Sequence, residues 1–367
     1  LETARTPNMD ALLAAGDAGL HVPVSTGVTP GSGPGHLALF GFDPLRYRVG
    51  RGALAALGVE FPLQPGDVAV RGNLCTVDGE GIVTDRRAGR IATEEAAPVL
   101  DLLDGIRVPG AQTFVRPVKE HRFLLVLRPE EATDADIEDT DPGVTGVPPL
   151  DVVAGSPSSD FAARVARDWL ARVPETLSGQ PRANMVLLRG FATLPDWPLF
   201  PDVFRMRSLA MAAYPMYRGV ARLVGMDAVA VDDDPGALLP ALEERIDDYD
   251  FFFLHVKGTD KAGEDGDFRQ KVDIIERVDE VLPALRETGI GVTLITGDHS
   301  TPAKMKSHSW HPVPFLLHGG PGRGHRSEGT AGLGESECAR GALGTIRGCE
   351  LMPLAAARAG RLGKFGA

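Results

Sequence analysis

The sequence has few cysteines, no long apolar run and no excess of positive charge. Three cysteines among 367 residues cannot build a disulfide framework, and their odd number fits a reducing compartment. The most apolar block, residues 251–256, is far shorter than the roughly 18 apolar residues that a membrane-spanning helix requires. We therefore expect a cytoplasmic protein that does not bind a membrane.

The charge balance is acidic. Lys and Arg number 38 against 50 Asp and Glu, a net charge of −12, which argues against a nucleic-acid-binding protein. Hydrophobic residues make up 43% of the chain and charged residues 24%, a composition typical of globular domains and too apolar for intrinsic disorder. At roughly 100–200 residues per domain, the length predicts two or three domains.

The sequence pattern divides the chain into an interrupted core and an insert. After residue 150, amphipathic segments alternate with short, almost wholly apolar ones, which predicts a mostly parallel sheet with helices on both faces. The expected helices are 158–171, 209–224, 235–246 and 268–287, and the expected strands are 184–188, 228–231, 251–256, 291–296 and 315–318. Between 58 and 150, short alternating segments separated by turns predict a smaller α+β domain. We thus expect an α/β core of residues 1–57 and 151–367.

Two predicted strands lead into polar loops that could bind a metal. Residues 257–267 follow one strand and residues 297–302 follow another, with His308 and His311 shortly afterwards. Functional groups gather at the carboxyl ends of strands in such sheets, and mixed carboxylate and imidazole ligands suit Zn or Mn better than Ca. The alternative is that these acidic residues are solvated helix caps, with Asp265 or Asp267 capping a helix that begins near Phe268.

A serine between two glycines precedes a predicted helix near residue 36. Ser32 could be a nucleophile on a sharp turn or part of an anion site on helix amides. The alternative is a flexible loop in which Ser32 only caps the helix. The segment is not an esterase nucleophile elbow, because Pro30 and Pro34 occupy the two positions where that motif needs glycine.

Arginines cluster at three places that are candidates for binding an anion: residues 85–90, residues 46–51 and residues 189–190. Arg86, Arg87 and Arg90 lie in one short segment, and Arg189 ends the predicted strand 184–188. Most arginines keep a surface soluble. In an acidic chain, however, arginine next to glycine at the end of an element is suited to clamping a phosphate or carboxylate through two parallel hydrogen bonds.

Taken together, these motifs resemble the archaeal-type 2,3-bisphosphoglycerate-independent phosphoglycerate mutases of the alkaline phosphatase superfamily. The motifs keep the family's order along nearly the whole chain. The matching segments are residues 6–10, 30–32, 36–38, 41–44, 50–52, 85–91, 139–142, 183–184, 188–190, 257–260, 297–302, 308 and 312–314. The resemblance implies an alkaline-phosphatase-like core with a mostly parallel sheet flanked by helices, and an inserted domain that covers a small-molecule substrate.

The resemblance also implies an activity and a set of site residues. The reaction interconverts 3-phosphoglycerate and 2-phosphoglycerate through a phosphoserine, with two divalent metals and without 2,3-bisphosphoglycerate. Manganese is the expected metal, and zinc, cobalt and magnesium are alternatives. The implied nucleophile is Ser32, which also binds a metal. The other implied residues are the metal ligands Asp260, Glu264, Asp298, His299 and His308, and the substrate-binding residues Arg86, Arg87, Arg90, Arg189 and Lys257.

The sequence departs from the family pattern at two places. Glu264 stands where the family has a metal-binding histidine, which predicts either a preference for a harder metal or a weakened site. The family's first strand carries a metal-binding aspartate, and we expect that residue upstream of Leu1. Two other functions remain open, a phosphohydrolase on the same scaffold and a non-catalytic metal- or phosphosugar-binding relative. The oligomeric state is also open, a homo-oligomer included.

Overall fold

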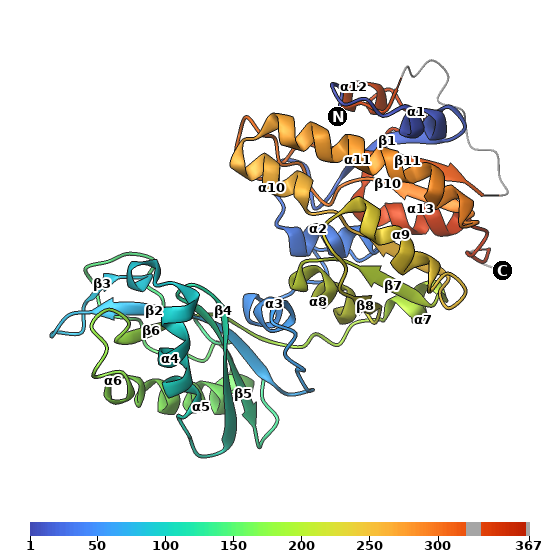
Figure 1. Cartoon of the computed structure of the whole chain (residues 1–367). Helices are drawn as coiled ribbons and strands as arrows, with labels where there is room; N and C mark the ends of the chain where they lie inside the picture. The colour runs from blue at the N-terminus through green and yellow to red at the C-terminus, as the bar shows by residue number, and fades with distance from the viewer. Residues whose placement is uncertain (321–331, 365–367) are drawn as a thin grey trace. The chain divides into compact units, whose positions relative to one another are not determined.

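The computed structural model describes residues 1–320 and 332–364, which form two compact units (Figure 1). The core unit comprises Leu1–Arg48 and Trp197–Ala367, and the inserted unit comprises Val49–Asp196. The mixed α/β fold matches the expectation, and the inserted unit interrupts the core unit in the sequence. The inserted unit is longer than the predicted 58–150, because strand β6 (Met185–Thr193), expected in the core, pairs with β2 (Val68–Val77) of the insert.

The described strands of the core unit form two sheets. A three-stranded parallel sheet has the order β8 (Asp227–Val229), β7 (Ser208–Met211), β9 (Phe251–Leu254). A four-stranded sheet has the order β10 (Val292–Ile295), β11 (Val313–Gly319), β1 (Asp17–Val22), β12 (Thr345–Arg347). Strand β11 is antiparallel to β1 and β10, whereas β12 is parallel to β1. The predicted parallel pairing is thus present in the first sheet, while the second sheet is mixed.

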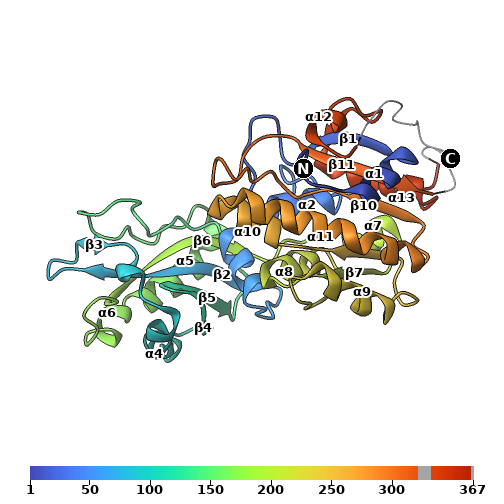
Figure 2. The ribbon, with the colours of Figure 1, turned by 45° about the horizontal axis from the view of Figure 1, so that its top comes forward.

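Helices pack around these two sheets. They are α1 (Pro7–Ala14), α2 (Ser32–Leu39), α7 (Phe200–Phe204), α8 (Pro215–Leu223), α9 (Pro235–Glu243), α10 (Gly258–Asp265), α11 (Phe268–Glu287), α12 (Glu335–Cys338) and α13 (Leu351–Arg358). Figure 2 shows α11 running across the core unit with α10 at its N-terminal end. Asp279 of α11 is buried and accepts hydrogen bonds from the backbone N–H groups of Asn8 and Met9, which fixes the N-terminus of α1 on α11.

Two predicted elements of the core unit differ from the structure. The predicted helix 209–224 is a strand followed by a helix, β7 and α8, because Pro215 begins a new helix. The predicted polar loop 257–267 contains helix α10, which ends at Gly266 in the left-handed conformation. The capping alternative holds for Asp267, whose carboxylate accepts a hydrogen bond from the backbone N–H of Gln270 at 2.9 Å.

The inserted unit is built on an antiparallel sheet. Its order is β3 (Val83–Asp85), β2, β5 (Arg122–Pro129), β4 (Ala111–Lys119), with β6 also paired to β2. Its helices are α3 (Arg51–Gly58), α4 (Thr93–Asp104), α5 (Asp160–Leu170) and α6 (Val173–Thr176). Side chains of α4 and α5, including Trp169, form the main core with one face of the sheet. Figure 1 shows these two helices beside the sheet. The short α3 packs on the opposite face through Ala56.

Short 3₁₀ turns complete the described structure, at Ala88–Arg90, Pro157–Ser159 and Gly348–Glu350. Among the described helices, none combines the length and the apolar character that crossing a membrane requires.

Candidate functional site

Ser32 is the first residue of α2, with Gly31 in the cap position. The interpretation of Ser32 as a mere helix cap is therefore wrong. Its hydroxyl lies 3.1 Å from Nε2 of His299, which belongs to the loop that follows β10. A helix N-terminus places the hydroxyl in a region of positive potential, which favours an anion bound at that position.

Two glycines allow the helices of the site to approach this loop closely. A Cβ atom at Gly35 of α2 would overlap the carbonyl oxygen of Asp298, and one at Gly263 of α10 would overlap the carbonyl oxygen of Thr301. Both helices therefore contact the backbone of loop 297–302 directly. This close packing brings Ser32 and Asp260, which are distant in the sequence, to the same loop.

The hydrogen bonds of Thr301 determine which nitrogen of His299 carries a proton. Oγ1 of Thr301 donates to Oδ1 of Asp260 at 2.6 Å, so it can only accept from Nδ1 of His299, 3.0 Å away. Burial lowers the pKa of His299, which keeps the ring neutral. Nε2 therefore has a free lone pair directed toward Ser32, and it can accept a proton or bind a cation.

His308 is held in the same way. Its Nδ1 hydrogen-bonds the carbonyl oxygen of Pro30 at 3.0 Å, so its Nε2 is the free nitrogen. That nitrogen lies 3.6 Å from the carboxylates of both Asp260 and Glu264, and the ring stacks on His299 with centroids 3.8 Å apart. Metal-binding histidines commonly donate their second N–H to such a partner, which orients the ring.

Asp298 is a buried carboxylate that lies between two histidines. Burial raises its pKa, but the neighbouring His36 and His299 outweigh burial and hold the pKa well below its usual range. Its Oδ2 atom is buried and makes no hydrogen bond, although Nδ1 of His36 and Nε2 of His299 each lie 3.2 Å away. A buried, unpaired carboxylate oxygen beside a free imidazole nitrogen is suited to binding a metal ion.

We call Asp260, Asp298, His299 and His308 the ligand cluster. One ligand atom each from Asp260, His299 and His308 lies within 4.8 Å of the others. The structure thus brings together Ser32 and the predicted metal ligands of the core unit. Glu264 lies at the edge of the cluster with its side chain 51% exposed.

Lys257 lies beside the ligand cluster, between two oxygen acceptors. Its ammonium donates to the Tyr217 hydroxyl at 3.0 Å and to Oδ2 of Asp260 at 2.9 Å. Burial lowers the pKa of Lys257, but these two hydrogen bonds outweigh burial and raise it above its ordinary value. The side chain therefore carries a fixed positive charge at neutral pH.

The inserted unit carries a second group of charged side chains. Register places Arg71 of β2 opposite Arg189 of β6, and Asn73 of β2 opposite Arg122 of β5, so all four share one face of the sheet. Arg51, the first residue of α3, packs against Gly190 next to Arg189. We call Arg51, Arg71, Arg122 and Arg189 the arginine face.

The arginine face has unmet hydrogen-bonding capacity. Within the described part of the chain, Arg71 has no carboxylate at ion-pair distance; burial lowers its pKa, and so do Arg122, Arg51 and Arg189. Nε of Arg122 and Oδ1 of Asn73 are buried without a hydrogen-bond partner. Guanidinium groups held together in this way attract an anion with several oxygens.

The other predicted arginines have different surroundings. Arg86 donates to both carboxylate oxygens of Asp141 at 2.8 Å and also to the carbonyl oxygen of Gly143, so its donors are occupied. Arg189 has looser contacts, 3.5 Å to Asp139 and 3.4 Å to Asp141. Arg87 and Arg90 are exposed at the surface of the same unit.

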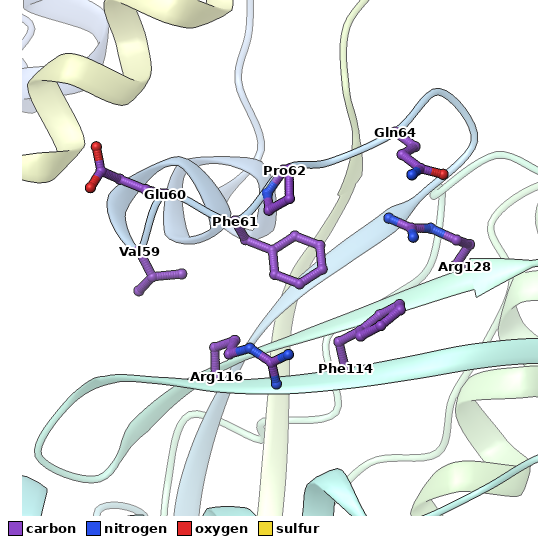
Figure 3. A pocket seen from close by; sticks show the side chains of 8 residues that line it. All are labelled: Val59, Glu60, Phe61, Pro62, Gln64, Phe114, Arg116 and Arg128. Carbon is purple, nitrogen blue, oxygen red and sulfur yellow. The ribbon is translucent and has the colours of Figure 1, made fainter. Parts of the chain in front are cut away.

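A separate pocket of about 360 Å³ lies on the face that α3 covers (Figure 3). Its lining residues are Val59, Glu60, Phe61, Pro62, Gln64, Phe114, Arg116 and Arg128. Both guanidinium groups already have carboxylate partners, since Arg128 pairs with Asp67 and Arg116 pairs with Asp104. The pocket therefore has no uncompensated positive charge, unlike the arginine face.

Sequence reasoning missed five residues that contribute to the two sites. A positive side chain within the apolar alternation of residues 68–77 could have indicated Arg71, and the same pattern holds for Arg122 beside residues 123–127. His36 and Thr301 lie in segments that match the family, but nothing in the sequence indicated their contacts. Tyr217 carried no signal, because its role depends on contacts between segments distant in the chain.

Known proteins resemble this chain in sequence and in fold. The model of a family described as 2,3-bisphosphoglycerate-independent phosphoglycerate mutase matches residues 14–183. A protein of Deinococcus radiodurans named "Probable 2,3-bisphosphoglycerate-independent phosphoglycerate mutase" is 46% identical, covering all of this chain and 90% of the relative. A protein of the same name from Thermus thermophilus is 48% identical, covering all of this chain and 91% of the relative.

Two solved structures extend over almost the same length. One is a protein from Pyrococcus horikoshii, with a TM-score of 0.81 and 31% identity, covering all of this chain and 93% of that structure. The other is the cofactor-independent phosphoglycerate mutase from Thermoplasma acidophilum, with a TM-score of 0.76 and 26% identity, covering 98% and 93% of the two chains.

Proposed function

This chain belongs to the family of 2,3-bisphosphoglycerate-independent phosphoglycerate mutases, and we propose that it interconverts 3-phosphoglycerate and 2-phosphoglycerate through a phosphoserine on Ser32. It is an isomerase of the cofactor-independent class. The observation that carries the proposal is the contact between the Ser32 hydroxyl and the free Nε2 of His299, inside the ligand cluster.

The proposed reaction consists of two phosphoryl transfers, one to Ser32 and one from it. First, Oγ of Ser32 attacks the phosphorus of 3-phosphoglycerate; the Oγ–P bond forms, the bond from phosphorus to the C3 oxygen breaks, and a proton passes from the serine side to that oxygen. Then the C2 hydroxyl oxygen of the bound glycerate attacks the same phosphorus, and Oγ regains its proton as the Oγ–P bond breaks. Neither water nor free phosphate is consumed.

We propose two divalent metal ions at the ligand cluster, with manganese as the first expectation. Ser32, Asp298 and His299 would hold one ion, and Asp260, His308 and Glu264 the other. The donor set fits such ions, because both imidazoles present a free Nε2 and Asp298 presents an unpaired oxygen. When bound, divalent ions lower the pKa of a serine hydroxyl and neutralise charge on a transferring phosphoryl group.

We assign substrate binding to the arginine face and to Lys257. Arg71, Arg122 and Arg189 offer donors for the carboxylate and phosphate of phosphoglycerate, and the occupied donors of Arg86 favour a structural role for that residue. Lys257 supplies a fixed positive charge next to the ligand cluster. We also propose that the core is of the alkaline phosphatase type and that the inserted unit covers the substrate, since a phosphoserine survives only when water is excluded.

A product assay with a mass measurement tests the proposal. The protein is incubated with 3-phosphoglycerate and Mn²⁺, and 2-phosphoglycerate and inorganic phosphate are measured separately. We expect 2-phosphoglycerate with little free phosphate, and a mass gain of one phosphoryl group that Ser32→Ala abolishes. Ser25→Ala, a change in the preceding loop, serves as the matched control. Stoichiometric phosphate release would indicate a phosphohydrolase, and the absence of both products would indicate a non-catalytic relative.

A further inference from the structure

Tyr217 is a buried residue next to Ser32, the proposed nucleophile. The proposed reaction gives Tyr217 no role. It lies on α8 with 2% of its surface exposed, and its hydroxyl accepts the hydrogen bond from Lys257 at 3.0 Å. Burial raises the pKa of this hydroxyl most strongly, while Lys257 and the nearby Ser32 side chain lower it through hydrogen bonds. The Tyr217 hydroxyl is thus hydrogen-bonded to Lys257 and has the Ser32 side chain nearby.

The ring of Tyr217 is fixed by the helix that carries the nucleophile. It stacks on the imidazole of His36 with centroids 4.4 Å apart and an interplanar angle of 12°, and it also contacts His255 at 4.2 Å. His36 lies one helical turn after Ser32, and its Nδ1 hydrogen-bonds the Ser32 carbonyl oxygen at 2.7 Å. Any shift of the Tyr217 ring would thus disturb packing against α2 itself.

The position of the Lys257 ammonium depends on Tyr217 because a carboxylate also lies within hydrogen-bonding distance of it. Its ammonium is 2.9 Å from Oδ2 of Asp260, and an ammonium on a four-carbon stem rotates readily toward a carboxylate. The Tyr217 hydroxyl gives it a second acceptor on the side of α2. The ammonium is held between the two oxygens instead of pairing with Asp260 alone.

We propose that Tyr217 is a positioning residue that holds Lys257 in place for phosphoryl transfer at Ser32. This inference rests on the proposed function, because Lys257 is useful there only if a phosphoryl group passes through the site. Tyr217 itself forms no bond in the reaction. Its hydroxyl fixes a positive charge whose placement governs how well the charge on the transferring phosphoryl group is neutralised.

The chain offers a matched pair of tyrosines for the test. Tyr214 is three residues earlier, and its ring lies 5.3 Å from the Lys257 ammonium, close to the 5.4 Å of Tyr217. Tyr214 is 46% exposed, and within the described structure its hydroxyl makes no hydrogen bond. Replacing either residue by Phe keeps the ring, so only Tyr217→Phe removes a hydrogen bond to Lys257.

The experiment compares steady-state kinetics of Tyr217→Phe, Tyr214→Phe and Lys257→Met with the wild type. We expect Tyr217→Phe to lower kcat by roughly 10–100-fold with KM changed by less than about twofold, since misplacing a catalytic charge affects the transition state. Tyr214→Phe should stay within about twofold of the wild type in both constants, because it removes no hydrogen bond to Lys257. Equal melting temperatures of the two Phe variants would verify the fold.

The double variant decides whether Tyr217 acts through Lys257. If it does, Tyr217→Phe in the Lys257→Met background causes no further loss, whereas independent effects would multiply. A second measurement needs neither bound metal nor catalytic turnover. It follows, by peptide mass, the rate at which an amine-reactive acylating reagent modifies Lys257. We expect this rate to rise several-fold in Tyr217→Phe only.

Two results would overturn the inference while leaving the proposed function intact. One is a Tyr217→Phe enzyme whose kcat and Lys257 reactivity match those of Tyr214→Phe. The other is a full Tyr217→Phe effect in the Lys257→Met background. A wild-type protein that forms no 2-phosphoglycerate would instead contradict the proposed function, so the two failures are distinguishable.

Discussion

The two units of the molecule handle charge in opposite ways. In the ligand cluster of the core unit, carboxylates lie beside imidazoles, and the Nδ1 atoms of His299 and His308 each hydrogen-bond an oxygen. On the arginine face of the inserted unit, like charges lie together, and the described residues provide no carboxylate at ion-pair distance from Arg71. The first arrangement presents lone pairs, which suit a cation, whereas the second presents hydrogen-bond donors, which suit an anion.

One reaction on phosphoglycerate would use both the ligand cluster and the arginine face. Phosphoglycerate carries a carboxylate and a phosphate, so recognising it requires donors. Transferring its phosphoryl group requires an activated oxygen and strong local positive charge, which metals supply at a cluster of lone pairs. Damage to the core unit should therefore reduce kcat and metal content, and damage to the arginine face should raise KM.

The largest effect is expected from Asp298→Asn. The amide keeps the size of the side chain but removes the charge of a buried carboxylate that His36 and His299 stabilise. We expect bound metal to fall and kcat to fall by roughly 10³-fold, comparable to removing a main electrostatic group from an active site. Metal content by elemental analysis and kcat are measured, with the exposed Asp265→Asn as the control. Full metal content in Asp298→Asn would contradict the assignment.

Arg71→Gln is expected to have a smaller effect than Asp298→Asn, and to change KM instead of kcat. Losing a charge-assisted hydrogen bond of about 1.5–3 kcal/mol should raise KM roughly 10–100-fold and leave metal content unchanged. Arg164→Gln, at an exposed position of α5 in the same unit, is the control. If Arg71→Gln changed kcat alone, the division of roles between the two units would be wrong.

Arg86→Met tests the structural role given to Arg86. Burial raises the pKa of Asp141, but the Arg86 guanidinium, together with the backbone N–H of Gly143 and the charge of Arg189, outweighs burial and holds that pKa below its ordinary value of 3.8. The pair therefore stabilises the fold above pH 3.8 and loses its effect as pH falls through the lowered pKa. We expect the variant to lose about 2 kcal/mol of unfolding free energy at pH 7.

The corresponding measurement is urea unfolding of the wild type and Arg86→Met between pH 7 and acid. The difference in unfolding free energy should shrink only at the acid end. KM should stay close to that of the wild type. A KM increase as large as that of Arg71→Gln would return Arg86 to the substrate-binding residues.

The smallest effect is expected from Glu264→His. The Glu264 side chain is half exposed at the edge of the ligand cluster, 3.6 Å from Nε2 of His308. Replacing oxygen by imidazole should shift the preference a few-fold from Mn²⁺ toward Zn²⁺, with kcat changed less than about tenfold. Titrations of wild type, Glu264→His and Glu264→Gln with both metals measure this. Identical profiles for all three would show that Glu264 is not a ligand.

The sequence predicts individual helices and strands of this molecule well, but it predicts strand pairing and tertiary contacts poorly. Residues 251–254 and 268–287 fold as expected because apolar runs and helical periodicity are local signals. The prediction that residues 184–188 form a strand of the core unit is wrong, because an apolar sequence does not specify the strand with which it pairs. Ser32, Asp260 and His299 stood out through their motifs, whereas Tyr217 and Thr301 act across contacts that only folding creates.

The glycines that let α2 and α10 contact loop 297–302 have a consequence for how this site tolerates change. Gly35 and Gly263 have no side chain that could take part in binding or catalysis. Any larger residue at either position would nevertheless push a helix away from loop 297–302. Ser32 and Asp260 would then move with their helices. In a saturation mutagenesis library selected for activity, Gly35 and Gly263 should tolerate as few substitutions as the residues that contact the substrate.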